Sequence, residues 1–568
     1  MMQKRWLQKE KPVSTVVDSL SSSLNIDIKL ASLLAQRGVT TFDEAKHFFR
    51  PEFSDLHNPF LMKDMDKAVE RLEQAVANEE NILIYGDYDV DGTTAVAFFY
   101  TFLSTFYTKT DYYIPDRYKE GYGISFAGID FAEANNFSLI VALDCGIRSN
   151  DKVEYASKKG IDFIICDHHL PGEETPDAAA VLDPKQADCT YPFKELSGCG
   201  IGFKLAHAYA QNNNIAFTEL EKYIDLVAVS IAADIVPITG ENRVLTFYGL
   251  KKLNQNPSNG LRSIIELNSI KRELTISDIV FIIAPRINAA GRIASGRQAV
   301  ELLISSVKDN HSEMALGINQ TNSERQVLDK DITEHALGMI ADSKVLQKRK
   351  STVLFHKNWH KGVVGIVASR LIETYYKPTI ILAVEDGYAT GSARSVRDYN
   401  VYEAIEACSD LLEQFGGHKY AAGLKIKIEN VEAFAEKFEL VVSETISEDM
   451  LTPCIEIDDD LKLENVNEKF LRILKQFAPF GPGNMNPVFM TKNLSCKGFP
   501  KVMKDKHLKL EVFDSFNPLR TIEALAFNMA EHYESLSSKI PFTICYTIEE
   551  NNWNGKKSIQ LNVKDMRF

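Results

Sequence analysis

Cysteine pairs and long apolar runs are both missing from this chain of 568 residues. Its eight cysteines are scattered and none stand in a Cys-x-x-Cys spacing, so the sequence suggests neither a zinc ribbon nor a disulfide framework. No apolar run is long enough to span a membrane, and the opening residues lack the apolar core of a signal peptide. We therefore expect a cytoplasmic protein without a membrane partner.

An excess of positive charge, which often marks nucleic-acid-binding proteins, is also absent. The formal net charge is −14 at pH 7. Because electrostatic attraction depends on the local field rather than on the total charge, basic residues confined to one groove can still bind nucleic acid. The overall charge therefore does not exclude a nucleic-acid substrate.

Three carboxylates stand at alternate positions directly after a short apolar run at residues 82–85; they are Asp87, Asp89 and Asp91. Mutual repulsion among such groups would raise their pKa values and weaken the local fold unless cations lay among them. Carboxylate oxygens suit Mg²⁺ or Mn²⁺, and a nearby histidine favours Mn²⁺. A solvated turn or a calcium loop is the alternative, but an EF-hand needs flanking helices where this segment has a strand.

Three more apolar runs, at residues 139–143, 163–165 and 226–233, also lead into acidic residues. Runs of this kind, separated by amphipathic helical stretches, indicate a parallel α/β sheet whose sites gather at the carboxyl ends of its strands. An unpaired carboxylate in apolar surroundings is costly, so a metal or a strong donor is expected beside it. The residues at the ends of these runs are Asp144, Asp167, His168, His169 and Asp234.

Eight motifs in order carry a resemblance to a known family. They are Asp87–Gly92, Asp144–Gly146, Asp167–His169, Ala233–Pro237, Pro285–Arg292, Gly391–Ser395, Gly416–Gly423 and Pro479–Asn484. The chain resembles the DHH phosphoesterases, and within them the RecJ-type single-strand-specific 5′→3′ exonucleases. The resemblance covers nearly the whole chain.

The resemblance implies an enzyme that hydrolyses phosphodiester bonds of single-stranded DNA from its 5′ end and releases mononucleotides, in DNA repair and recombination. It implies two-metal catalysis with Mn²⁺ or Mg²⁺. A single-strand-binding protein and a helicase are the partners it suggests, and we expect a monomer.

The fold class that we expect is α/β, with five parts along the chain. They are an N-terminal region (1–59), a DHH catalytic domain with a parallel sheet (60–295), a long helical connector (296–349), a second α/β, DHH-associated domain (350–446) and a C-terminal OB-like β-barrel that binds nucleic acid (447–568).

The catalytic set combines metal ligands with groups that orient them. The expected metal ligands are Asp89, Asp91, Asp144, His168 and Asp234. Asp87, Asp167 and His169 complete the set, either as further ligands or as orienting groups, which affect metal affinity almost as strongly. The sequence does not separate these two roles.

Phosphate-handling features lie mostly in the second α/β domain. A glycine-bearing loop opens an amphipathic helix at residues 360–370, where free N–H groups can receive an anion. Ser392 and Arg394 are predicted in a turn just past a strand at residues 379–384, and suit a terminal phosphate. The resemblance implies a substrate-binding set of Arg117, Arg286, Asn288, Arg292, Ser392, Arg394 and His418.

In the last domain, Phe480 and Phe489 flank a Gly-Pro-Gly-Asn turn and can stack on bases, or they can fill the barrel core. A basic stretch follows, which consists of Lys501, Lys504, Lys506, His507 and Lys509. These residues predict a domain that grips single strands without sequence preference.

Two other functions are open at this stage. A DHH phosphodiesterase acting on short RNA or cyclic dinucleotides would resemble the first two domains alone, so the residues after Cys454 disfavour it. A catalytically silent scaffold would have lost carboxylates, whereas all the motifs here are intact. Related pyrophosphatases have a histidine ligand where this chain has Tyr85, which disfavours that activity.

Overall fold

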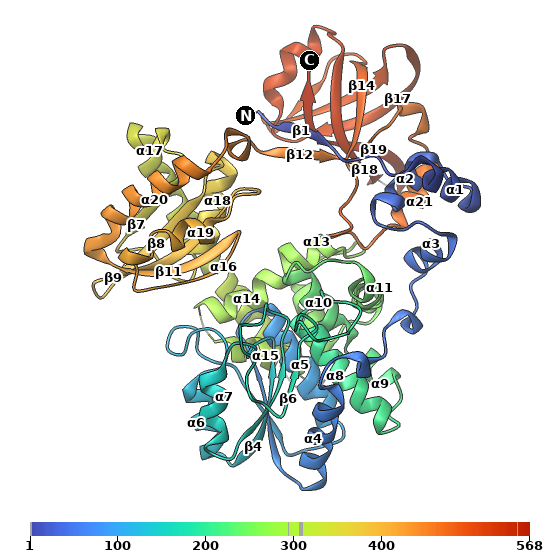
Figure 1. Cartoon of the computed structure of the whole chain (residues 1–568). Coiled ribbons are helices and arrows are strands. Elements are labelled where there is room, and N and C mark those ends of the chain that lie inside the picture. Colours follow the sequence, from blue (N-terminus) through green and yellow to red (C-terminus); the bar gives the residue numbers. More distant parts are fainter. Residues whose placement is uncertain (1–2, 294, 306–309, 554) are drawn as a thin grey trace. The chain divides into compact units, whose positions relative to one another are not determined.

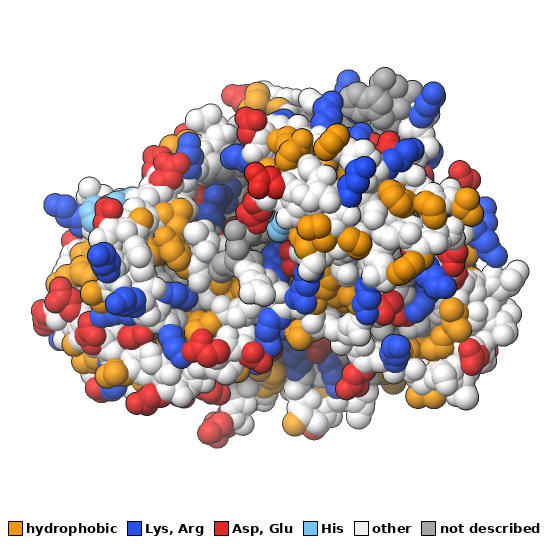
Figure 2. Space-filling model, turned by 90° about the horizontal axis from the view of Figure 1, so that it is seen from above, with side chains coloured by type: hydrophobic (Ala, Val, Ile, Leu, Met, Phe, Trp, Pro, Cys, Tyr) orange, Lys and Arg blue, Asp and Glu red, His pale blue; other side chains and the backbone are white. Residues whose placement is uncertain are grey.

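The computed structural model describes residues 3–293, 295–305, 310–553 and 555–568. The contacts divide the chain into a larger unit, Gln8–Thr321 with Ile457–Phe568, and a smaller unit, Met1–Leu7 with Asn322–Glu456. Each unit combines segments that are far apart in the sequence, as the colours of Figure 1 show. On the face shown in Figure 2, basic side chains are spread among acidic and hydrophobic ones.

The larger unit contains a five-stranded parallel sheet in the order β3-β2-β4-β5-β6. Its strands are β2 (Asn81–Gly86), β3 (Thr110–Tyr113), β4 (Phe137–Leu143), β5 (Asp162–Cys166) and β6 (Ala180–Leu182). Successive residues point to opposite faces of a strand, so Ile82 and Ile84 enter one apolar core while Leu83 and Tyr85 enter another. This is the parallel α/β sheet that the sequence predicts.

Helices cover both faces of this sheet (Figure 1). One face is covered by α4 (Met65–Ala77), α5 (Val90–Ser104) and α8 (Gly198–Asn212), and the other by α6 (Phe126–Ala134) and α7 (Asn150–Ser157). The strands are therefore buried on both sides, which explains their nearly continuous apolar sequences.

A layer of further helices follows in the chain. It comprises α9 (Thr218–Glu221), α10 (Ile224–Ala233), α11 (Gly240–Gln255), α12 (Asn259–Leu267), α13 (Ile276–Asp278), a π-helical turn (Ile279–Ile283), α14 (Ala284–Ile293) and α15 (Gly296–Ile304). The 32-residue helix α16 (His311–Asp342) and the short α17 (Lys344–Lys348) come next, in the region predicted as a helical connector, of which residues 306–309 lie outside the described part of the chain. Among the described residues, no helix combines the length and apolarity needed to cross a membrane.

The C-terminal part of the larger unit is a closed β-barrel. Strand β14 pairs with both β18 and β16, and this closes the ring β14-β18-β19-β17-β16. Its strands are β14 (Phe489–Cys496), β16 (His507–Asp514), β17 (Asn517–Ala526), β18 (Phe542–Trp553) and β19 (Lys556–Arg567), and the short β13 (Asp459–Asp460) and β15 (Lys501–Met503) flank them. The predicted β-barrel is confirmed.

The N-terminal residues share their apolar core with this barrel. Helices α1 (Ser14–Leu24) and α2 (Ile28–Gln36) contribute Leu20, Leu30 and Leu33 to a cluster that also holds Phe470, of α21 (Glu468–Lys475), and barrel residues. Phe489 belongs to this cluster and is fully buried, so of the two roles that the sequence leaves open for it, filling the barrel core is confirmed and base stacking is excluded. Moving this ring to the surface to stack on a base would lose the hydrophobic free energy of its burial.

The smaller unit has a mixed five-stranded sheet in the order β10-β11-β9-β8-β7. Its strands are β7 (Thr352–His356), β8 (Thr379–Glu385), β9 (Tyr388–Arg394), β10 (Gln414–His418) and β11 (Ala421–Lys427), and its helices are α18 (Val364–Tyr375), α19 (Val401–Glu406) and α20 (Val431–Thr445). A short strand β1 (Arg5–Gln8) pairs separately with β12 (Cys454–Ile457).

Ser392 and Arg394 lie within β9, not in a turn after a strand as the sequence predicts. The sequence Gly-Ser-Ala-Arg at residues 391–394 does not predict a strand, because it lacks the β-branched and aromatic side chains that are typical of strands. A side chain at Gly391 would place its Cβ 1.9 Å from the carbonyl oxygen of Ile381, so close packing against β8 excludes larger residues.

The Gly-Pro-Gly-Asn turn packs against the loop that follows Asp234. The N–H of Ile238 donates to the carbonyl of Pro482 at 2.7 Å. A Cβ on Gly481 would lie 2.4 Å from the end of the Ile238 side chain, so a larger residue would have to displace that side chain. The motif therefore joins the barrel side of the larger unit to the loop after α10.

Arg243, on α11, holds the same junction together. Its guanidinium is almost fully buried and donates to the carbonyls of Phe48 at 2.9 Å, Phe477 at 3.0 Å and Ala478 at 3.1 Å. The guanidinium carbon also lies 3.9 Å from the centre of the Phe48 ring. Burial lowers the pKa of Arg243 to about 9, so the group remains protonated at neutral pH.

We predict that Arg243→Ala lowers the free energy of unfolding by about 2–4 kcal/mol, because it removes the guanidinium donors to the carbonyls of Phe48 and Ala478 and one of the two donors to the carbonyl of Phe477. Arg243→Lys should recover only part of this loss, because an ammonium group restores a charged donor but lacks the planar, forked geometry of the guanidinium. Urea denaturation measures the effect, and Arg262→Ala, on the exposed surface of α12, is the matched control. A change no larger than that of the control would contradict the role of Arg243.

Candidate metal centre

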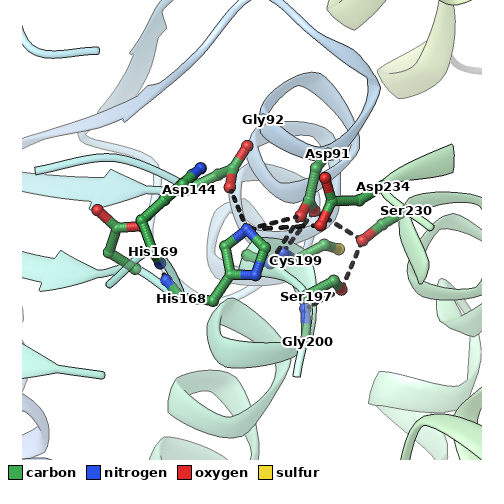
Figure 3. A network of polar contacts seen from close by, with 12 residues as sticks. Asp91, Gly92, Asp144, His168, His169, Ser197, Cys199, Gly200, Ser230 and Asp234 are labelled. Carbon is green, nitrogen blue, oxygen red and sulfur yellow. Dashed lines mark hydrogen bonds and ion pairs between the residues drawn. The ribbon is translucent and has the colours of Figure 1, made fainter. Parts of the chain in front are cut away.

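The predicted catalytic residues come from the ends of neighbouring strands and from two helices, α5 with Asp91 and α10 with Asp234. Asp87 and Asp89 follow β2, Asp144 follows β4, and residues 167–169 follow β5. Because β2, β4 and β5 are adjacent and parallel, their carboxyl ends meet at one edge of the sheet. Asp234 reaches the same place as the C-cap of α10 (Figure 3).

His168 lies at the centre of this cluster. Its Nε2 is 3.2 Å from Oδ1 of Asp144, 3.5 Å from Oδ2 of Asp234 and 3.8 Å from Oδ2 of Asp91. Neither ring nitrogen of His168 nor Oδ1 of Asp144 has a hydrogen-bond partner among the described residues. Adjacent ligands of an octahedral ion with bonds of about 2.1 Å lie about 3 Å apart, so this oxygen-rich donor set fits Mg²⁺ or Mn²⁺.

Two overlapping groups of residues can hold an ion. One consists of Asp91, His168 and Asp234, and the other of Asp144, His168 and His169. The side chain of Asp234 is 30% exposed, so it is not the deeply buried carboxylate that the sequence suggests. The cluster is therefore accessible from solvent at Asp234.

The charges of the cluster require a cation. Burial, together with repulsion from Asp91 and Asp89, raises the pKa of Asp144 well above its usual value and that of Asp234 to about 8. Burial also lowers the pKa of His168, so this ring is neutral and available as a ligand. Without a positive ion, protons would neutralise part of the site at neutral pH.

Asp167 does not point into the cluster. One of its oxygens accepts from the N–H of Ile147 at 2.9 Å, and the other from the N–H of His168 and from Nδ1 of His169, both at 2.7 Å. Burial alone would raise the pKa of Asp167, but the bond and charge of His169, together with the N–H of Ile147 and the charge of His168, outweigh burial and lower that pKa to about 2. Burial opposes the charged form of His169 as well, but the bond and charge of Asp167 and the charges of Asp234 and Asp89 together raise the pKa of His169 to about 9.

Asp87 and Asp89 shape the start of α5. Asp87 is fully buried and accepts from the N–H of Gly123 at 3.1 Å, while its second oxygen has no partner in the described residues. Asp89 is the N-cap of α5 and accepts from the N–H of Gly92 at 3.0 Å. A Cβ on Gly92 would lie 2.5–2.8 Å from the Asp87 backbone, so glycine is required for the tight turn.

Comparison with known proteins shows the family to which this chain belongs. Models of the DHH family N-terminal domain, the DHHA1 domain and the RecJ OB domain match residues 81–231, 329–444 and 457–565. The single-stranded-DNA-specific exonuclease RecJ of Bacillus subtilis is 36% identical over 99% of this chain and 70% of its own length, and that of Dickeya dadantii is 31% identical over 94% and 95%. The chain belongs to the RecJ family. The resemblance read from the motifs is confirmed.

Solved RecJ structures share the fold. The Mn²⁺ complex of RecJ from Thermus thermophilus aligns with a TM-score of 0.84 and 24% identity, and covers 99% of this chain and 79% of that one. A second exonuclease RecJ, bound to manganese, aligns with a TM-score of 0.59 and 29% identity over 68% of this chain and 96% of its own.

The predicted substrate residues of the larger unit divide into two groups. The Arg117 guanidinium carbon lies 4.9 Å from the centre of the Tyr88 ring, beside the carboxylate motif. Burial raises the pKa of this tyrosine to about 12, and the charges of Arg117 and Arg292 partly oppose the rise. Arg286 instead donates from Nη1 to the carbonyl of Ile282 at 2.6 Å and contacts two asparagines on other helices. Asn288 is half-buried on α14.

In the smaller unit, Ser392 and Arg394 form one polar site beside α18. Nη1 of Arg394 donates to Oγ of Ser392 at 2.6 Å. A Cβ on Gly365, in the first turn of α18, would lie 2.9 Å from Nη2 of Arg394. His418 is exposed on β10. Gly417 beside it has φ +143° and no room for a side chain, so this position of the strand requires glycine.

The N-terminus of α8 also belongs to the site, although none of the predicted site residues lies there. The N–H groups of Gly198 and Cys199 donate to the Asp91 carboxylate at 2.7 and 2.8 Å, and a Cβ on Gly198 would lie 2.5 Å from Oδ1 of Asp144. The glycine-rich start of this helix, Ser197–Gly200, is the signal that indicates an anion site. In this RecJ-family chain the anion is a carboxylate of the protein itself.

We predict that Gly198→Ala weakens Mn²⁺ binding by about ten-fold or more, because the added methyl displaces the Asp144 carboxylate. The matched control on the same helix is Gly202→Ala, whose Cβ meets only the flexible end of Leu143. Titration of Mn²⁺ with each variant, followed by electron paramagnetic resonance of the free ion, measures the difference. Equal affinity of both variants would show that Gly198 has no special role.

Proposed function

We propose that this chain is a single-stranded-DNA-specific exonuclease that degrades DNA in the 5′→3′ direction and releases mononucleotides. The observation that carries the proposal is the convergence of Asp144, Asp234 and Asp91 on His168, in a chain that has all three RecJ domains. The enzyme is a metal-dependent hydrolase, and its role is in DNA repair and recombination. The OB domain disfavours the alternative of a cyclic-dinucleotide phosphodiesterase.

The metal ligands that we propose are Asp89, Asp91, Asp144, His168 and Asp234. They would hold two ions of Mn²⁺ or Mg²⁺, whose chemistry would be to lower the pKa of an attacking water and to neutralise charge on the phosphate. Support comes from the donor set, which lacks other partners at Asp144 and His168 in the described chain, and from a family relative solved with manganese.

Asp167 and His169 act beside the ligands in this proposal. Because both oxygens of Asp167 accept bonds from protein donors, and those from residues 168 and 169 converge on Oδ1, it orients these two residues. His169 keeps its proton at neutral pH, and its Nε2 lies 3.3 Å from the Tyr122 hydroxyl on the open side of the site. It can therefore donate to a phosphate oxygen.

The smaller unit supplies the proposed 5′-phosphate site. A planar guanidinium and a hydroxyl at the N-terminal turn of α18 combine charge, directional donors and a helix dipole, which together favour a phosphate dianion. Arg117, Arg286, Asn288, Arg292 and His418 are proposed to contact other phosphates of the strand.

The barrel is proposed to hold the strand. Lys501, Lys504 and Lys506 are exposed on the hairpin formed by β15 and β16. We also propose the five-part domain division given by the sequence, a monomeric state, a cytoplasmic location, and a single-strand-binding protein and a helicase as partners.

We predict that Asp144→Asn lowers exonuclease activity by more than about 100-fold, the upper limit expected for loss of a merely orienting group. Asn is the suitable replacement because Asp144 has φ +61°, a conformation that asparagine tolerates well. Affinity for single-stranded DNA and thermal stability should change little. The exposed Asp188→Asn is the control, and near-normal turnover of Asp144→Asn with Mn²⁺ would contradict the proposal.

We predict that Arg394→Ala slows degradation of 5′-phosphorylated strands about ten-fold more than that of 5′-hydroxyl strands, since a charge-assisted bond contributes about 1.5–3 kcal/mol. Initial rates on matched labelled substrates measure this ratio. Arg397→Ala, in the same unit, is the control for the loss of a cation. An equal loss on both substrates would remove Arg394 from the terminal-phosphate site.

A further inference from the structure

A pair of buried hydroxyls lies behind the Asp91 carboxylate. Oγ of Ser230, on α10, is 2.6 Å from Oδ1 of Asp91 and also 2.6 Å from Oγ of Ser197, the N-cap of α8 (Figure 3). The N–H of Gly200 in turn donates to Oγ of Ser197 at 3.1 Å. Both serines are completely buried, so water does not compete for these bonds.

The direction of this chain of hydrogen bonds is fixed by its end. An ionised carboxylate can only accept, so the one hydroxyl proton of Ser230 points to Asp91. The short contact between the two serines is then made by the proton of Ser197. The order therefore runs from the N–H of Gly200 to Ser197, to Ser230 and to Asp91, and the N-terminal end of the α8 dipole polarises it.

The number of lone pairs then decides how Asp91 can bind a metal. Each carboxylate oxygen accepts about two bonds in its plane. Oδ1 receives the N–H of Cys199 and the hydroxyl of Ser230, so it is saturated. Oδ2 receives the N–H of Gly198 and no other donor from the described part of the chain, and it is the oxygen that faces Nε2 of His168. The one lone pair of the carboxylate that remains open is therefore on Oδ2, the oxygen nearer to His168.

We propose that Ser230 is a positioning residue that restricts Asp91 to bind the metal ion through Oδ2 alone. The inference rests on the metal centre of the proposed function. Ser230 and Asp234 are four residues apart and lie on the same face of α10, with the N–H of Asp234 bonded to the carbonyl of Ser230 at 2.9 Å. A single helix thus supplies one carboxylate of the site and fixes the rotation of another.

The test is Mn²⁺ binding in the absence of DNA, measured on the full-length chain. Ser230→Ala should weaken binding about 10–100-fold, as loss of an orienting partner does, because a lone pair of Oδ1 is then open and competes with Oδ2 for the ion. Ser197→Ala should weaken binding less, since Ser230 can still donate to Asp91. Ser263→Ala removes a buried hydroxyl that bonds only within α12, and it should bind Mn²⁺ like the parent.

Ser230→Cys is a second test if the alanine variant is unstable. Because a thiol is a weak donor, the Mn²⁺ affinity of this variant should lie between those of the parent and of Ser230→Ala. Thermal melting in EDTA reports folding independently. At saturating Mn²⁺ the kcat of Ser230→Ala should approach that of the parent, while the Mn²⁺ concentration needed for half activity stays raised. This separates positioning of the metal from general damage.

Each failure has a separate meaning. If the parent chain binds no Mn²⁺, the proposed function fails together with this inference. If the parent binds Mn²⁺ and folded Ser230→Ala binds it as tightly, only the positioning role is overturned. If Ser197→Ala is the more damaging substitution, the order of the hydrogen bonds is wrong and the inference is overturned as well.

Discussion

Repulsion among carboxylates that share one small buried space is the constraint on which the site depends. Asp144, Asp91 and Asp89 each raise the cost of ionising their neighbours, and burial raises it further. The protein offsets part of this cost with fixed donors, chiefly the first N–H groups of α8 and the hydroxyl of Ser230. A divalent cation offsets the remainder, and this gives the site its affinity for metal.

The parallel sheet makes such crowding possible. Its neighbouring strands end at one edge, and helices on both faces exclude water from behind that edge. The glycines at positions 92 and 198 let backbone approach carboxylate within distances that no side chain allows. Small residues at these places are therefore as necessary to the site as its charged residues.

Further contacts within the larger unit hold the loop after Asp234 in place. The loop after Asp234 is bonded to the turn before the barrel, and Arg243 ties the same turn to the N-terminal helices. Since the barrel and residues near the N-terminus share one core, removal of the C-terminal residues would expose that core and would not simply delete a DNA-binding module. Point substitutions on the barrel surface are the cleaner way to examine strand binding.

The sequence by itself determined the parallel sheet, the closed barrel and the set of acidic residues, because each depends on local patterns such as an apolar run that ends in carboxylates. Only the tertiary structure decided which oxygen of Asp91 remains open, that Asp167 turns away toward His169, and that Phe489 fills a core. The strand that carries Ser392 and Arg394 was also missed. These features depend on partners distant in the sequence, such as Ser230 for Asp91, and no local pattern records which distant residues meet.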